Sequence, residues 1–298
     1  GNVWVAYDGE LTSVGGGLNR WSPSAGWRSY QAVDGLPGQS VRGVTSDRQG
    51  GVWIHYGDRD TRGEDAYFGV SHLAADGKLT YHNRANGFPT DHVSAIAVAP
   101  DGTMLMVADD TNDIVQGTPD SGWTTSPWPD EGRRLWPLRA IAIDDRGNRW
   151  FFSWHGFARW ALEGKWTFFP NDTELREMWG RGPSPDGLWE PYRSTNIAFG
   201  SDGSNYLYTD WRDGFGFGSG AGFFNLSEVG NWRRFHTDDP PVGRDVAAVA
   251  CDSTGRVWLT SGNLIERRRD GTWVGAPPTS DIGVDSDVLV TDPQNRMW

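Results

Sequence analysis

Short runs of apolar residues, separated by turns rich in Asp and Gly, recur along the chain. In residues 88–123 these runs cover 93–98, 103–107 and 113–116, and a fourth opens at Trp123. Runs this short, joined by tight turns, are typical of an antiparallel meander of strands. The pattern therefore predicts an all-β unit of four consecutive strands.

The same unit returns at intervals of 40 to 56 residues. It is marked by the phrase Gly-x-x-Trp, usually with an Asp shortly before the Gly. The fourth position of the phrase is occupied in turn by Trp4, Trp53, Leu105, Trp150, Tyr206, Trp258 and Trp298. A repeat of this length predicts a β-propeller built from four-stranded antiparallel blades.

The number of blades follows from the number of inner strands. Small and β-branched residues are expected in these strands, because neighbouring blades crowd together near the central axis. Six segments qualify: 41–44, 93–98, 138–143, 196–199, 246–251 and 288–290. We expect six blades, with the last inner strand joining the outer strands of the first blade. Seven blades, one of them incomplete, is the alternative.

A second series of large side chains opens the fourth strand of each unit. Its members are Trp27, Leu79, Trp123, Trp166, Trp232 and Trp273. Two ring series in each unit are most simply explained as core between neighbouring blades. We therefore expect these side chains to be buried.

Composition limits the partners and the organisation of the chain. The 298 residues carry a formal net charge of −12, which argues against nucleic acid, because binding phosphates requires a basic surface. No apolar stretch approaches the length of a transmembrane helix. We expect one propeller domain over residues 1–298. We also expect it to be a piece of a longer chain, because the sequence opens inside a repeat.

Two phrases resemble the two-component-regulator propeller repeats of bacterial sensor ectodomains and large surface proteins. Residues 34–41 read Asp-Gly-Leu-Pro-Gly-Gln-Ser-Val and run into 47–54, and residues 86–93 lead likewise to Asp101-Gly102. Residues 17–21 and 156–160 look like the next strand of that family. The resemblance implies an extracellular or periplasmic location and a binding or scaffolding role, without catalysis.

Three loops depart from the repeat, and function would lie on such loops. The first, residues 57–65, contains four carboxylates, those of Asp58, Asp60, Glu64 and Asp65. Clustered oxygen ligands suit Ca²⁺, so for the leading hypothesis we expect no cofactor other than a possible Ca²⁺ ion at this loop. Their spacing matches no EF-hand and two arginines lie among them, so a solvated loop is the other interpretation.

The second loop is an insertion at residues 170–194 that contains Trp179, Trp189 and Tyr192. These rings could stack on a sugar or a partner surface, or could fold back against a blade. The third loop, residues 210–222, contains Trp211, Phe215 and Phe217 among several glycines. No Gly-Lys-Ser/Thr follows, so we expect a hairpin that could pack on a neighbouring chain, not a phosphate site.

The leading functional hypothesis is a non-enzymatic binding or assembly module, whose rigid blades present loops to a protein or glycan partner or to further domains of the same chain. The alternative is a propeller lyase or hydrolase with a His/Glu/metal centre at one mouth, as in virginiamycin-lyase-like propellers. Loss of activity on mutation of His55 or His155 would favour that alternative. A quinone-dependent dehydrogenase ranks last.

Overall fold

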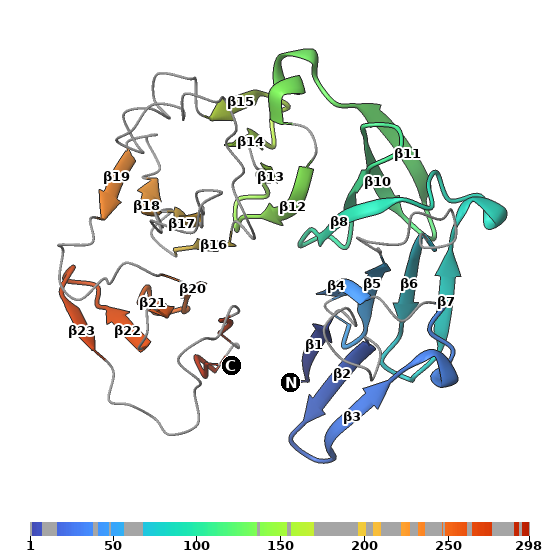
Figure 1. Cartoon of the computed structure of the whole chain (residues 1–298), viewed down its shortest axis with the longest axis horizontal. Coiled ribbons are helices and arrows are strands. Elements are labelled where there is room, and N and C mark those ends of the chain that lie inside the picture. Colours follow the sequence, from blue (N-terminus) through green and yellow to red (C-terminus); the bar gives the residue numbers. More distant parts are fainter. Residues whose placement is uncertain are drawn as a thin grey trace, which may run out of the picture. The chain divides into compact units, whose positions relative to one another are not determined.

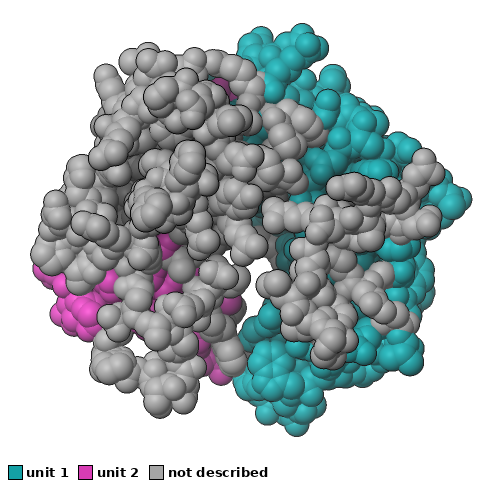
Figure 2. All heavy atoms as spheres, viewed as in Figure 1, with its two compact units in different colours: residues 1–153, 158–167 teal, residues 154–157, 168–298 magenta. Residues whose placement is uncertain are grey.

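The computed structural model describes most of the first half of the chain and shorter pieces of the second half. The described residues are 2–7, 17–37, 41–47, 49–56, 68–135, 138–153, 156–169, 196–200, 205–209, 222–226, 232–235, 246, 248–260, 264–275, 289–291 and 294–297. They fall in two compact units, which Figure 2 colours separately. One unit is Gly1–Ser153 with Ala158–Thr167, and the other is Trp154–Phe157 with Phe168–Trp298.

The first unit begins with a three-stranded antiparallel sheet and continues with two four-stranded ones (Figure 1). The three-stranded sheet contains β1 (Val3–Tyr7), β2 (Gly17–Ser22) and β3 (Gly26–Tyr30). The next contains β4 (Val41–Ser46), β5 (Val52–Tyr56), β6 (Val70–Leu73) and β7 (Leu79–His82). The third contains β8 (Val93–Val98), β9 (Met104–Ala108), β10 (Asp113–Thr118) and β11 (Gly122–Pro127).

Three further four-stranded sheets follow in the chain. The next, whose residues are shared between the two units, contains β12 (Leu138–Ile143), β13 (Arg149–Ser153), β14 (Gly156–Trp160) and β15 (Trp166–Phe169). The second unit contains β16 (Asn196–Phe199), β17 (Asn205–Thr209), β18 (Gly222–Leu226) and β19 (Trp232–Phe235). It also contains β20 (Ala248–Cys251), β21 (Val257–Thr260), β22 (Leu264–Arg267) and β23 (Trp273–Gly275).

Helical structure among the described residues is limited to short 3-10 turns between sheets, namely η2 (Ala32–Asp34), η4 (Arg84–Asn86) and η5 (Asp130–Leu135). Within the described ranges, no helix has the length and the apolar character needed to cross a bilayer.

Within each unit, first strands of consecutive sheets pack beside one another. In the first unit this series runs from β1 to β4, β8 and β12, and in the second unit β16 lies beside β20. Four-stranded meanders that meet through their first strands are the blades of a β-propeller. The predicted fold class, an all-β propeller of four-stranded antiparallel blades, is confirmed.

The predicted blade count is not confirmed. The described residues form five four-stranded blades and one three-stranded sheet, instead of the six blades we expected or the seven of the alternative. Five of the six predicted inner strands form; of the sixth, predicted at 288–290, the described residues 289 and 290 lie in no strand. Leu289 instead packs against Ala248 and Ala250, and the segment makes only an isolated bridge between Thr291 and Met297. An apolar run of three residues is too short to signal a strand reliably.

The apolar core lies between consecutive blades. Trp53 and Val70 of the β4–β7 blade pack with Val93, Met104 and Met106 of the β8–β11 blade, and all five side chains are at most 4% exposed. These strands carry apolar residues at nearly every position because both faces are covered. The same burial on both faces gives the loops of each blade a rigid base.

The two Trp series differ in burial. In the first series, Trp53 and Trp150 are 4% and 1% exposed, as expected. In the second series, Trp123, Trp166 and Trp273 are partly buried, and the side chain of Trp232 lies outside the described part. The expectation that the whole second series is core is wrong at Trp27, which is 61% exposed. Trp27 lies on the outer strand β3, where residues 26–29 are all exposed.

A β-bulge occurs at the same place in the first strand of three consecutive blades. The extra residues are Arg42 in β4, Ser94 in β8 and Arg139 in β12, each the second residue of its strand. Bulges of this kind redirect side chains and are enriched near binding sites. Three bulges at the same register position mark this end of the inner strands as a candidate binding region.

Candidate functional site

The functional residues that the sequence predicts in three loops lie outside the described part of the chain. The possible Ca²⁺ ligands Asp58, Asp60, Glu64 and Asp65, and the aromatic residues Trp179, Trp189, Tyr192, Trp211, Phe215 and Phe217, all lie outside the described residues. Their roles stay predictions. In the part of the chain that is described, no group of three or more His, Cys, Asp or Glu side chains is placed to hold a metal ion.

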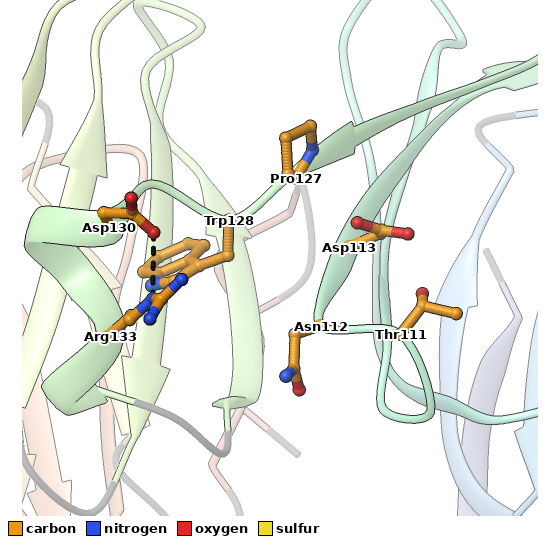
Figure 3. Close-up of a pocket in the computed structure, with 7 residues that line it drawn as sticks. All are labelled: Thr111, Asn112, Asp113, Pro127, Trp128, Asp130 and Arg133. Carbon is orange, nitrogen blue, oxygen red and sulfur yellow. Dashed lines mark ion pairs between the residues drawn. The ribbon is translucent and has the colours of Figure 1, made fainter.

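The described part contains a pocket that the sequence analysis did not nominate. Its volume is about 550 Å³, and it opens where β10 begins, where β11 ends and along the 3-10 turn η5 (Figure 3). Seven residues line it: Thr111, Asn112, Asp113, Pro127, Trp128, Asp130 and Arg133. A volume of this size is within the range of sites that hold small molecules.

Backbone hydrogen bonds fix the strand side of the pocket. The Asn112 amide donates to the carbonyl of Ala108 at 3.1 Å, and the Asn112 carbonyl accepts from the amide of Trp128 at 3.1 Å. Asn112 has φ of 60°, in the left-handed region that Asn tolerates better than most residues. Asp113 is paired with Pro127 across the β10–β11 ladder. The polar side chains at this end therefore start from a well-defined backbone.

Trp128 holds the other side of the pocket in place. Its ring is 7% exposed and meets Phe151 and Trp166 edge to face, with ring centroids 5.2 and 5.0 Å apart. Little of the indole face is therefore open to a ligand. Its role is to anchor the segment that leads into η5 against the next blade.

Apart from Pro127, the groups open to solvent in the pocket are polar, and they carry both signs of charge. Arg133 and Asp130 form an ion pair at 2.8 Å, and both side chains are about four-fifths exposed. Thr111 and Asn112 are exposed and Asp113 is partly buried. Figure 3 shows these two groups of side chains on opposite sides of the pocket. The arrangement offers hydrogen-bond donors and acceptors to a hydrophilic partner.

A polar run, Asp109-Asp110-Thr111-Asn112-Asp113, and a proline-flanked Trp, Pro127-Trp128-Pro129, are visible in the sequence. Each alone looks like an ordinary turn. What makes them a pocket is the pairing of β10 with β11, which sets Asp113 opposite Pro127, and only the strand register shows that.

Comparisons with known proteins support the fold. No family model matches the chain, and no curated protein does. Among solved structures, virginiamycin B lyase from Staphylococcus aureus is 14% identical with a TM-score of 0.61, over 98% of this chain and 94% of the lyase. At this identity the likeness shows the propeller fold alone.

Two larger proteins contain a similar propeller. The surface component PorZ of the type-IX secretion system of Porphyromonas gingivalis is 13% identical with a TM-score of 0.64, over 98% of this chain but 43% of PorZ. The extracellular domain of a protein assigned to the hybrid two-component systems of B. thetaiotaomicron is 14% identical with a TM-score of 0.56, over 99% of this chain and 36% of that one.

Proposed function

We propose that this chain is a non-enzymatic extracellular or periplasmic binding or assembly module, and that the pocket at the start of β10 contacts a protein or glycan partner. The observation that carries the proposal is the pocket itself. It is a concavity of about 550 Å³, lined by polar and charged side chains together with Pro127 and Trp128, and strand pairing and the buried Trp128 hold its walls. Polar groups on a rigid base bind with a smaller loss of conformational entropy than groups on a mobile loop.

The proposed location is supported by likeness to proteins whose names state where they act. Both PorZ and the two-component protein are described as surface or extracellular, and each is more than twice as long as the part matched by this chain. A partner could therefore also be a further domain of the same polypeptide. The net charge of −12 supports a partner other than nucleic acid.

Binding to arrays of bacterial surface polysaccharides and of peptides tests the proposal, with calorimetry on each ligand found. We expect the double variant Asp113→Asn, Arg133→Ala to weaken binding at least about tenfold, since each lost charged hydrogen bond is worth about 1.5–3 kcal/mol. The matched control is Asp120→Asn, an exposed carboxylate in the β10–β11 turn outside the pocket. Equal affinity of the double variant and the wild type would rule out the pocket as the binding site.

A lyase or hydrolase is the second candidate, and the specific observation behind it is the match to 94% of virginiamycin B lyase. Such an enzyme would need a His/Glu/metal centre, and His155, one of its sequence candidates, lies outside the described residues. Chromatography of virginiamycin B after incubation with the protein and Mg²⁺ tests it. Conversion that disappears in His155→Ala and persists in the exposed-site control Asp120→Asn would replace the binding proposal.

A further inference from the structure

Two arginines lie directly opposite each other in the three-stranded sheet of β1, β2 and β3 (Figure 1). Arg20 of β2 is paired with Arg28 of β3, and on its other side Arg20 is paired with Trp4 of β1. Side chains that are paired across a ladder share one face of the sheet, and like charges in such positions repel each other. The chain therefore places two positive charges side by side on one face.

Two aromatic rings in contact with each other hold these guanidinium groups. The guanidinium carbon of Arg20 lies 5.6 Å from the centre of the Trp4 ring, and that of Arg28 lies 4.6 Å from the centre of the Tyr30 ring. The centroids of the two rings are 5.7 Å apart. Tyr30 is two residues beyond Arg28 in the same strand, so it projects from the same face. The four side chains form one continuous group, which we call the arginine cluster.

The charges of the arginine cluster are not balanced by a neighbouring carboxylate. Within the part of the chain that the structure describes, neither guanidinium forms an ion pair or a hydrogen bond, and Nε of Arg20 is buried without a partner. Arg28 is exposed and Arg20 is partly exposed. Two adjacent cations that are open to solvent and unpaired are a site at which an anion can bind.

The corresponding place in the next blade shows which anion suits this position. Trp53 of β5 occupies the same position of the repeat as Trp4, and His72 of β6 lies opposite Trp53 as Arg20 lies opposite Trp4. The imidazole of His72 stacks on Trp53, and its Nε2 lies 2.7 Å from Oδ2 of Asp47. The side chain opposite the repeat Trp thus has a carboxylate as its partner in that blade.

A carboxylate also fits the donors of the arginine cluster. A guanidinium group presents N–H donors in a planar fork, and it forms short, charge-assisted bonds to carboxylate oxygens. A neutral hydroxyl would leave both positive charges unbalanced, and a cation would be repelled. The net charge of −12 repels a polyanion more strongly than a group with a single negative charge. A ligand with one carboxylate is therefore favoured.

We propose that Arg20 and Arg28 form a second binding site, which takes the carboxylate of a small organic acid or of a uronic-acid sugar. The N–H groups of the two guanidiniums donate to the carboxylate oxygens, while the rings of Trp4 and Tyr30 keep both arginines on this face of the sheet. These residues are distinct from those of the pocket at β10, and the site does not depend on the function proposed for that pocket.

The test is NMR of the arginine Nε–H groups in the whole protein labelled with ¹⁵N-arginine. The protein is titrated with acetate, glucuronate and glucose at a constant ionic strength set with sodium chloride. The resonances of the two arginines are assigned by their loss in Arg20→Gln and Arg28→Gln. We expect acetate and glucuronate to shift both resonances saturably. Glucose, which has the sugar ring without the carboxylate, should leave them unchanged.

Each of the two variants should raise the dissociation constant for glucuronate about tenfold, measured on the arginine that remains. Binding of glucuronate that is tighter than that of acetate would show that the site prefers a carboxylate carried on a sugar, and equal binding would show that it recognises any small acid. Arg269→Gln is the matched control, because Arg269 is an exposed arginine in the turn between β22 and β23. It should bind as the wild type does.

Three results would overturn the proposal. The first is that neither acid moves the two resonances in the folded wild type. The second is a shift that sodium chloride alone reproduces, since it reports only the screening of charges. The third is equal affinity of Arg28→Gln and the wild type. Because Arg28 is exposed, its variant should fold, and circular dichroism of both proteins checks this.

Discussion

The carboxylate of Asp144 accepts the indole N–H of Trp150, with Oδ2 3.0 Å from Nε1, while its other oxygen caps the turn that joins β12 to β13. Oδ1 accepts the amides of Arg146 and Asn148 at 3.0 and 2.8 Å. One side chain therefore connects a tight turn to a buried ring of the next strand. The Asp-x-x-Gly-x-x-Trp phrase therefore encodes a capped turn and a buried Trp that donates a hydrogen bond to the capping carboxylate.

The same turn chemistry recurs in two other blades. Asp252 caps its turn through Oδ1, and its Oδ2 lies 3.4 Å from Nε1 of Trp258. In the β4–β7 blade, Asp47 caps its turn in the same way, but its Oδ2 pairs with Nε2 of His72 at 2.7 Å. The ring of His72 stacks on Trp53, with centroids 4.4 Å apart. The imidazole is thus the partner of the carboxylate Oδ2 in this blade, a role that the indole N–H has in the other two.

We expect Asp144→Ala to lower the free energy of unfolding by about 3 kcal/mol, because hydrogen bonds to a charged group contribute about 1.5–3 kcal/mol each and are not additive. Urea denaturation followed by fluorescence measures the change. Asp145→Ala is the matched control, since Asp145 is exposed and adjacent, and it should stay within about 0.5 kcal/mol of the wild type. Equal losses in both variants would show that the hydrogen bonds of Asp144 do not stabilise the turn.

Acid should destabilise the protein partly through Asp47. Burial raises the pKa of this carboxyl, but the hydrogen bonds from His72 and from the amides of Gln49 and Gly51 outweigh it and hold the pKa below the usual value of 3.8. A carboxyl with a lowered folded pKa stabilises the fold above its unfolded pKa and loses that effect as the pH falls through the folded pKa.

The variant Asp47→Asn should therefore show a smaller loss of stability below about pH 4 than the wild type does. Thermal unfolding at a series of pH values measures this difference. Asp76→Asn, at an exposed turn of the same blade, is the control and should follow the wild-type curve. If Asp47→Asn and the wild type lose stability in parallel, this carboxylate does not contribute to the acid transition.

The Trp128 side chain should contribute strongly to stability, and that of Trp27 should not. Trp128 is buried against Phe151 and Trp166, so Trp128→Ala should cost about 3–5 kcal/mol. Trp27 is 61% exposed, and Trp27→Ala should change stability by less than about 1 kcal/mol. Chemical denaturation of both variants provides the comparison. A small effect at Trp128 would mean that η5 is not anchored by its ring.

Substitution of Gly43 tests the close packing around His55. Its added methyl group would overlap Cε1 of the ring, so Gly43→Ala should destabilise by about 1–3 kcal/mol, the usual cost of overpacking. Gly275→Ala, where a Cβ would meet nothing within 4 Å, is the control and should be near neutral. Differential scanning calorimetry compares the two. A neutral Gly43→Ala would show that the ring can move away from β4.

The parts of the fold that local chemistry determines were predictable from the sequence. The Asp and Gly of each turn act on neighbouring residues, so the start of the second strand could be read at positions such as Trp53 and Trp150. The number of complete blades could not be predicted, because the apolar run at 288–290 resembles an inner strand, whereas Leu289 packs on Ala248 and Ala250 without belonging to a strand. Pairing between distant segments has no local signature.

The candidate site depends on contacts between residues that lie farther apart in the sequence. The β10 pocket needs the register that sets Asp113 opposite Pro127. His55 was considered in the sequence only as part of a metal centre. Its glycine neighbour at position 43 lies across the β4–β5 ladder. Neither relation can be read from spacing.

In two repeats, the residues bonded to the capping carboxylate are encoded beside it in the sequence. Asp144 and Asp252 bond to amides and an indole encoded within the next six residues, so a gene segment for one of these repeats carries the groups that bond to its own capping carboxylate. Duplication or loss of one segment would change the number of blades without removing a turn's support from those that remain. Intervals as unequal as 40 and 56 residues are compatible with this, since the variation falls in loops outside the turn.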